Sequence, residues 1–419
     1  MRLILICFVF SILCIESAAQ SLQEVYAEGT KAYENKDYGL FLQKMQEADS
    51  LRPNHPTILY NMSAGLALND QKDEAVATLR RVLWMNAEMP FLTDEDFSSL
   101  KEFPPFDEMN QEIAALKQEV SIGSKAFELE DKLLHPEGIA YHKKTGQFFI
   151  GSVHQNKIVS INKKGEVSDF LATDDLMAIM GLQVDKKRGL LWACSTPAPE
   201  MKDFKEGLLA EVLCIDIKKK KIVNRYKAPM EGDWLGDLIV SKSGTVYVSN
   251  SSADNPTIYK VAEGKEELEL VLDATELISL QGLALNANET DLFFSDYRYG
   301  LFKYDLITKE LLKLETNIQH PLKGIDGLYY YDGELIAIHN GLKPFRIVRY
   351  DLDETETIIV GYDFLEKALP EMNEPTLGFI KNNEFHYISN SPWWAYDREK
   401  NFNEDRVGKP LVRKIILRN

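Results

Sequence analysis

The sequence QGLALNANETDLFFSD, residues 281–296, contains the unit that decides the fold. It opens with a Gly-Leu signature, passes through a polar turn and ends in a short, aromatic, strand-like run. Five other segments share this order: a first residue, then a small or turn residue, then Ile or Leu, followed by a strand. The central residues of the six signatures are Gly138, Gly181, Asp237, Gly282, Gly327 and Thr376, and successive ones lie 43, 56, 45, 45 and 49 positions apart.

Two further strand-like runs follow each signature. The second strands are expected at 148–152, 190–195, 245–250, 291–296, 334–340 and 385–390. Six such units predict a mainly β fold, a six-bladed β-propeller over residues 125–419. The last unit reaches the end of the sequence after its third strand. We therefore predict that residues 125–130 supply its outer strand and join the start of the wheel to its end.

The preceding segment, residues 22–120, has a helical pattern with a period of 34 residues. Segments 22–55 and 56–89 match one another, with Phe41 aligned to Ala75. This resembles the tetratricopeptide pattern, a helix–turn–helix unit, and predicts a small α-helical domain in front of the propeller. Such a stack can hold a protein partner in a groove. Two repeats make only a shallow groove, which favours the alternative of a packing spacer.

The net charge of the chain and its N-terminal sequence indicate which partners it can bind and where it is located. The 48 Lys and Arg residues against 65 Asp and Glu residues give a net charge of −17, which argues against nucleic acid as a partner. Residues 1–19 have a basic start at Arg2, an apolar run over 3–15 and small residues at 17–19, the pattern of a signal peptide. We expect a secreted or periplasmic protein with no membrane contact after cleavage. The alternative is an uncleaved anchor.

The cysteines are few. Cleavage would leave Cys194 and Cys214, which lie in apolar strand-like runs. Two cysteines do not make a structural zinc site. We expect two buried free thiols, with a disulfide formed after export as the alternative.

The propeller repeat also predicts where a ligand would bind. Because strands alternate in direction, the start of each inner strand and the loop after each second strand share one face. The first signature residues should ring the channel there: Glu137, Met180, Gly236, Gln281, Asp326 and Pro375, with Glu374 beside the last. The loops on the same face add polar and aromatic side chains: His154, Asn250, Tyr297, Arg298, His339, Asn340 and Trp393.

Three members of this ring carry oxygen ligands. Glu137 and Asp326 supply carboxylates and Gln281 an amide carbonyl, the donors that suit calcium, magnesium or manganese. We expect a divalent cation, with calcium as the first candidate. The alternative is that these side chains are merely solvated, or bond to free N–H groups of neighbouring strands.

The signatures at Glu137-Gly138, Gln281-Gly282 and Asp326-Gly327, with the six-blade spacing, resemble the regucalcin/gluconolactonase-like propellers over residues 125–419. The resemblance implies one divalent metal at the channel mouth and hydrolysis of lactones. The family's first-blade glutamate matches Glu137 and its fifth-blade aspartate matches Asp326. Gly236 stands in place of the third-blade asparagine and Gln281 in place of the fourth-blade asparagine, so Asp237 or a water would complete the metal sphere.

The sequence hypothesis is thus an exported, metal-dependent hydrolase acting on a sugar or acyl lactone or a related ester. Asp326 is the expected general base, with His154 and His339 as alternatives. The expected substrate-binding side chains are Arg298, Tyr297, Asn340, Asn250 and Trp393. A non-catalytic, exported propeller that binds a ligand or a protein remains the alternative function.

Overall fold

The computed structural model describes residues 21–261 and 265–417. Contacts within the chain divide them into two compact units, one of residues 21–83 and 89–111 and one of residues 84–88 and 112–417. The predicted signal peptide lies outside the described residues. None of the helices within the described ranges has the length and apolar character needed to cross a bilayer.

The first unit is helical. It contains α1 (Leu22–Glu34), α2 (Tyr38–Leu51), α3 (Pro56–Leu68), the 3₁₀ helix η1 (Glu95–Leu100) and most of α4 (Lys72–Met85) and α5 (Pro104–Lys117), whose last residues belong to the second unit. The bounds of α1 and α2 recur in α3 and α4 at an offset of 34 residues, as the sequence period predicts. Met45, Leu59 and Leu79, which belong to the two repeats, are fully buried in its core.

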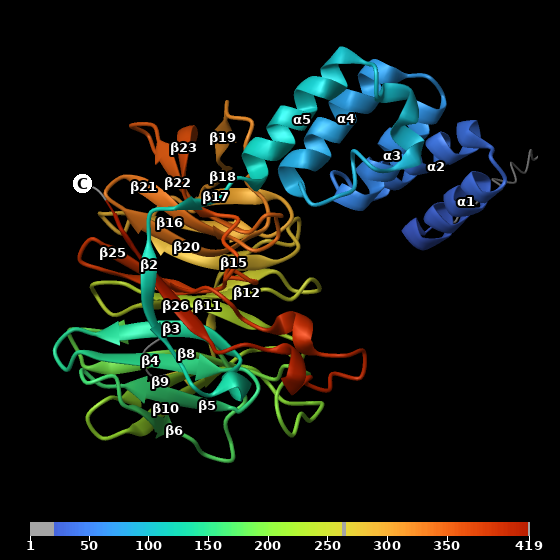
Figure 1. Cartoon of the computed structure of the whole chain (residues 1–419). Helices are drawn as coiled ribbons and strands as arrows, with labels where there is room; N and C mark the ends of the chain where they lie inside the picture. The colour runs from blue at the N-terminus through green and yellow to red at the C-terminus, as the bar shows by residue number, and fades with distance from the viewer. Residues whose placement is uncertain (1–20, 262–264, 418–419) are drawn as a thin grey trace, which may run out of the picture. The chain divides into compact units, whose positions relative to one another are not determined.

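The second unit is a six-bladed β-propeller, shown in Figure 1. The first three blades contain β3 (Pro136–His142), β4 (Gln147–Ser152), β5 (Lys157–Ile161) and β6 (Val167–Leu171); β7 (Ala178–Asp185), β8 (Leu190–Thr196), β9 (Glu211–Asp216) and β10 (Lys221–Lys227); and β11 (Leu235–Val240), β12 (Val246–Asn250), β13 (Thr257–Lys260) and β14 (Glu269–Asp273). The inner strand carries the signature in the first five blades, and in the sixth the signature directly precedes the inner strand.

The remaining blades follow the same plan. The fourth contains β15 (Leu280–Leu285), β16 (Asp291–Asp296), β17 (Gly300–Asp305) and β18 (Leu311–Lys313). The fifth contains β20 (Ile325–Tyr331), β21 (Glu334–His339), β22 (Arg346–Leu352) and β23 (Ile358–Lys367), with β1 (Val120–Ser121) and β19 (Glu315–Thr316) paired to β23. The sixth contains β24 (Gly378–Lys381), β25 (Glu384–Ile388), β26 (Leu411–Ile416) and β2 (Ser124–Glu128).

The sixth blade closes the wheel as predicted. The strand β2 pairs antiparallel with β26, with Ser124 opposite Lys414 and Glu128 opposite Leu411. Figure 1 shows the teal β2 beside the red β26, so the first and last strands of the propeller share one sheet. This pairing covers the edge of the last blade with a strand from the beginning of the propeller.

The glycine of the signature has a packing role. A Cβ on Gly282 would collide with the backbone N of Leu328 and the backbone O of Asp326, both on the inner strand of the next blade. A Cβ on Gly181 would lie 2.8 Å from the Cα of Asp237. The glycine therefore lets neighbouring inner strands approach closely around the channel. Strand pairing is interrupted at the signature in β3, β7, β11, β15 and β20, as in a β-bulge.

This contact predicts a stability effect. Gly282→Ala should lower the free energy of unfolding by about 1 to 3 kcal/mol, because its methyl group would meet backbone atoms that cannot rotate away. Urea denaturation of the full chain measures the loss. Gly408→Ala is the matched control, since a Cβ there meets no atom within 4 Å. Equal stability of the two variants would contradict this packing role.

The two cysteines of the propeller are free and buried, as expected. Cys194 lies on β8 and Cys214 on the adjacent β9, where Cys214 is opposite Trp192. Burial raises the pKa of both thiols, which keeps them protonated at neutral pH.

Candidate functional site: a carboxylate mouth of the central channel

The inner strands form a closed ring in which each packs against the next, in the order β3, β7, β11, β15, β20 and β24. Because each of these strands begins at the same face, side chains distant in sequence gather at one end of the channel. We call this end the carboxylate mouth, after Glu137, Gln281, Asp326 and Glu374. The electrostatic interactions among its carboxylates, described below, show that they are neighbours.

Glu137 is held by side chains of the segment that follows β25. Its Oε2 accepts hydrogen bonds from Trp393 Nε1 at 2.8 Å and from Ser391 Oγ at 3.3 Å. Both donors lie in the long connection between β25 and β26, outside the strand repeat. Glu137 is 8% exposed, and among the described residues no donor is found for the second oxygen of its carboxylate.

Asp326 is held from its own blade. Its Oδ2 accepts from Asn340 Nδ2 at 2.7 Å, and Asn340 Oδ1 accepts from the Tyr297 hydroxyl at 2.9 Å. This chain fixes the orientation of the carboxylate from the loops that follow β16 and β21. Asp326 Oδ1 has no hydrogen-bond donor among the described residues, so each carboxylate of the Glu137–Asp326 pair keeps one oxygen for another partner.

Gln281 lies beside Gly236, where Ser251 Oγ is the atom nearest to the position of a Cβ, at 2.9 Å. Its Oε1 lies 3.7 Å from the position that a Cβ on Gly236 would occupy, and its Nε2 donates to Ser279 Oγ at 2.8 Å. The two departures from the family pattern are therefore adjacent in space. The amide oxygen of Gln281 is directed to the region where a third-blade side chain would otherwise stand.

Asp237 is bound differently from the other carboxylates. Its Oδ1 accepts from the N–H of Leu238 at 2.8 Å, and its Oδ2 from the N–H of Leu283 at 3.3 Å. Both oxygens thus bind to backbone of the third and fourth blades. Asp237 still acts electrostatically on Asp326.

Burial and mutual repulsion govern the protonation of this site. Burial, the charge of Asp326 and that of Glu374 raise the pKa of Glu137 well above its ordinary value. Burial and the charge of Asp237 raise the pKa of Asp326. Burial raises the pKa of Asp237 and of Glu374 to about 7. The carboxylate mouth therefore brings several carboxyl groups together with too little positive charge nearby to balance them.

These shifts predict a pH dependence for the metal-free protein. In the unfolded chain the carboxyls are ionised well below pH 6, whereas in the folded protein Asp237 and Glu374 lose protons near pH 7. Stability should therefore fall as pH rises from 6.5 to 8, by about 1 to 2 kcal/mol. Burial lowers the pKa of His135, His320 and His339 in the folded state, so these groups oppose the fall while the unfolded histidines lose their protons, from pH 6.5 to about 7.5. Above about pH 7.5 they are neutral in both states.

Urea denaturation at several pH values in the presence of a chelator measures this slope. Asp237→Asn removes one of the titrating groups and should flatten it. A stability that is constant or that rises over pH 6.5 to 8 would contradict the raised pKa values.

The mouth suits a divalent cation in its donor chemistry. Glu137 and Asp326 each retain an oxygen, Gln281 contributes an amide oxygen, and a cation would relieve the repulsion between the carboxylates. In residues 21–261 and 265–417, however, no three His, Cys, Asp or Glu side chains converge as a complete cation cage. A cation here would depend on the amide of Gln281 and on water for the rest of its coordination.

The two candidate histidines are engaged elsewhere. His339 is fully buried, and its Nδ1 and Nε2 bind Lys323 O at 3.1 Å and the Tyr350 hydroxyl at 2.8 Å. Burial lowers its pKa well below the ordinary value, so it is a structural side chain with no nitrogen left to serve as a base. His154 binds Glu200 O through Nδ1 at 3.1 Å and stacks on Phe402.

Two predicted substrate-binding residues have other contacts. Asn250 is fully buried, donates to Asp233, Asn255 and Thr257, and accepts from two backbone N–H groups, so it holds its loop together. Trp393 lies in a 3₁₀ turn, η3 (Trp393–Ala395), and its indole N–H holds Glu137. Neither presents a free polar group to a ligand.

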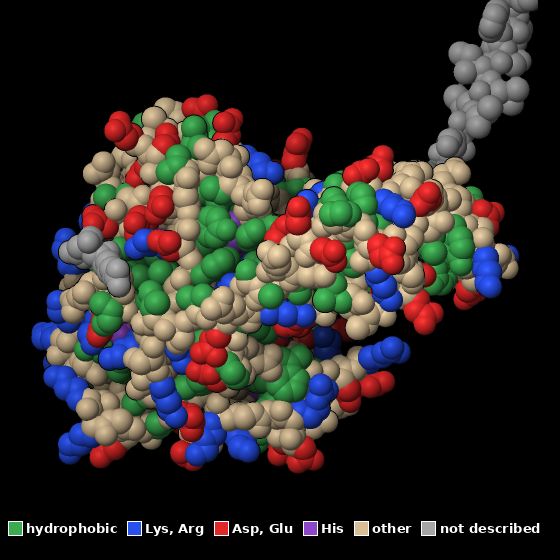
Figure 2. Space-filling model, turned by 45° about the horizontal axis from the view of Figure 1, so that its top comes forward, with side chains coloured by type: hydrophobic (Ala, Val, Ile, Leu, Met, Phe, Trp, Pro, Cys, Tyr) green, Lys and Arg blue, Asp and Glu red, His purple; other side chains and the backbone are tan. Residues whose placement is uncertain are grey.

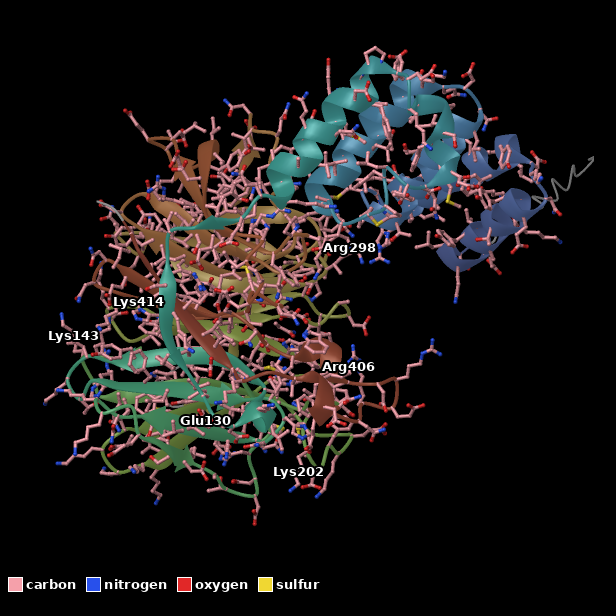
Figure 3. All side chains as sticks on the ribbon, viewed as in Figure 1. Glu130, Lys143, Lys202, Arg298, Arg406 and Lys414 are labelled. Carbon is pink, nitrogen blue, oxygen red and sulfur yellow. The ribbon has the colours of Figure 1, made fainter. Side chains whose placement is uncertain are left out.

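Arg298 and Tyr297 fit the prediction better. Both are half-buried in the loop after β16. The backbone N–H groups of Arg298 and Tyr299 donate to the carboxylate of Asp296 and anchor this loop. Figure 3 shows Arg298 on the same side of the propeller as Arg406, the side at which the inner strands begin. Burial and the charges of Asp326 and Glu374 raise the pKa of Tyr297, so its hydroxyl stays a donor.

Sequence reasoning missed His135 and the connection between β25 and β26. His135 is fully buried with a left-handed backbone (φ 43°), its Nδ1 lies 2.7 Å from the Tyr396 hydroxyl, and its ring meets Trp393 edge to face at 4.6 Å. It supports the indole that binds Glu137. The dipeptide His135-Pro136 before the signature was the available signal, but nothing in the repeat assigns it a partner.

Comparison with known proteins shows the fold of the propeller. A luciferin-regenerating enzyme superposes with a TM-score of 0.50 at 12% identity, over 71% of this chain and 95% of that one. A gluconolactonase from Xanthomonas campestris gives a TM-score of 0.48 at 13% identity, over 71% and 95% of the two chains. A virginiamycin B lyase from Staphylococcus aureus gives 0.45 at 13% identity, over 72% and 99%. No protein-family model and no curated protein matches the sequence.

Proposed function

We propose that this protein is an exported hydrolase that opens a lactone or related ester at the carboxylate mouth, with a divalent cation held by Glu137, Gln281 and Asp326. One observation carries the proposal. Glu137 of the first blade is buried and Asp326 of the fifth blade is half-buried; the two carboxylates repel one another, and each keeps one oxygen for which no donor is found among the described residues. Close carboxylates without a counter-charge favour the binding of a cation. Carboxylates with only a structural role would not need free oxygens.

The chain's own residues would divide the work as follows. A bound cation would supply Lewis-acid polarisation of the ester carbonyl. Asp326, oriented by Asn340 and with a pKa raised toward neutrality, would take the proton of the attacking water. Arg298, beside Tyr297 in the loop after β16, would bind hydroxyl or carboxylate groups of the substrate.

Trp393, Ser391 and His135 would act as positioning residues. Trp393 and Ser391 bind one oxygen of Glu137 and leave the other directed elsewhere, and His135 packs against the indole. This support is rigid because the donors are themselves buried or half-buried.

The test combines metal analysis with hydrolysis assays of the full-length chain. We expect about one equivalent of calcium or another divalent cation after dialysis, and turnover of at least one member of a panel of sugar-acid and acyl-homoserine lactones. Turnover should fall on chelation and return with the cation. If no lactone or ester is hydrolysed although the cation binds, the alternative of a non-catalytic, ligand-binding propeller is favoured.

A further inference from the structure

The opposite end of the channel holds a cavity that the proposed function does not use. Its volume is about 340 Å³, and it is lined by residues of all six inner strands and of the turns after them. Among its lining residues are Tyr141, Lys143, Lys186, Tyr329, Phe379 and Lys381. Figure 3 shows Lys143 on the side of the propeller away from Arg298 and Arg406, so this cavity opens on the other face. We call it the lysine opening.

The charges of the lysine opening are unusual for this protein. Three of its lining residues are lysines, and among the described residues that line it the single acid is Asp237. The whole chain has a net charge of −17, so a cationic opening is not a consequence of composition. Figure 2 shows Lys and Arg side chains along the left margin of the propeller, the side on which Lys143 lies in Figure 3. A cleft lined by one sign of charge attracts small ions of the other sign.

The lysines at the rim of the lysine opening are available to bind a ligand. Lys143 and Lys186 are exposed, and Lys143 Nζ donates to the neutral Asn382 Oδ1 at 3.3 Å. Lys381 Nζ lies 4.7 Å from the centre of the Tyr141 ring and 3.6 Å from Glu384 Oε2. An anion would therefore meet two ammonium groups for which no carboxylate partner is found among the described residues, and a third that is shared with Glu384.

The walls below the rim combine aromatic and aliphatic side chains with polar groups, among them Gln183 and Asp237. The rings of Tyr141 and Phe379 are stacked at 5.9 Å with an interplanar angle of 10°. Leucines from the neighbouring inner strands complete the wall, among them Leu182, Leu283 and Leu328. A cavity of this size, with aromatic and leucine side chains beside its polar groups, fits a small organic molecule better than an inorganic ion.

We propose that the lysine opening binds small carboxylic acids with an aromatic or aliphatic body, separately from the carboxylate mouth. The carboxylate of the ligand binds Lys143 and Lys186 at the rim, and its apolar body lies between the aromatic and leucine side chains of the wall. The site requires no metal and no reaction at the other end of the channel.

Isothermal calorimetry on the full-length chain with benzoate, and with its neutral analogue benzamide, tests this site. We expect benzoate to bind with a dissociation constant of about 1 mM or below and benzamide at least about tenfold more weakly. The double variant Lys143→Met/Lys186→Met should weaken benzoate binding by about tenfold or more. The control pair Lys164→Met/Lys218→Met, also exposed, should not change it.

A third variant separates this site from the proposed hydrolase. Asp326→Asn should leave benzoate binding unchanged, even if it abolishes hydrolysis. The proposal is overturned if benzoate does not bind, if benzamide binds as tightly, if both lysine pairs have the same effect, or if Asp326→Asn removes binding.

Discussion

Replacing Asp326 by asparagine is expected to reduce lactone hydrolysis by about 100-fold or more while the protein remains folded. Asparagine has nearly the same size and can still accept the hydrogen bond from Asn340, but it cannot take a proton from water. Loss of a general base costs about 10² to 10⁴ in rate. Steady-state kinetics on the best lactone of the panel should therefore show a fall in kcat larger than any change in KM.

Two controls make this result specific. Asp174→Asn, an exposed aspartate in the loop before β7, should keep the full rate. The melting temperature of Asp326→Asn should be equal to or above that of the parent in the metal-free state, because the variant removes one of the repelling carboxyls. If Asp326→Asn hydrolyses the lactone as fast as the parent protein, Asp326 is not the general base.

The largest stability loss is expected from Glu366→Gln. Arg413 donates to both oxygens of Glu366, at 2.9 and 2.6 Å, and the Tyr387 hydroxyl also donates to this carboxylate. The side chains of Glu366 and Arg413 are 0% and 6% exposed. Glutamine would leave the guanidinium buried without a full counter-charge, so unfolding should become easier by about 3 to 5 kcal/mol.

The same arginine provides the matched control. Glu371 also pairs with Arg413, but its side chain is 43% exposed. Glu371→Gln should therefore cost about 1 kcal/mol or less. Urea denaturation of both variants measures the difference. Equal losses would mean that burial does not set the strength of this ion pair, which links β23 of the fifth blade to β26 of the sixth.

The fold could be predicted because the propeller is a repeat. Six signatures with similar spacing fix the blade number, and the unfinished sixth unit requires a strand from upstream, which β2 supplies. The glycine of the signature is visible in the sequence for the same reason, since each blade must meet its neighbour at close range. Residues that obey the repeat can therefore be placed without knowing the structure.

Side chains outside the repeat could not be placed. The connection between β25 and β26 belongs to no blade, so nothing in the sequence indicates that Trp393 binds Glu137. Asn250 and His339 stand at the correct loop positions, but their burial and hydrogen bonds depend on neighbours that the repeat does not specify. Gly236 and Gln281 look like two separate losses in the sequence, whereas in the structure one lies beside the space left by the other.

Calcium titration by isothermal calorimetry, after removal of metal, tests the carboxylate mouth most directly. We expect one binding event in the parent protein. Glu137→Gln, which keeps the size and hydrogen-bonding capacity of the side chain but removes its charge, should weaken binding by at least about tenfold. The exposed control Asp174→Asn should leave it unchanged. The absence of calcium, magnesium and manganese binding, or equal affinity in Glu137→Gln, would contradict the account.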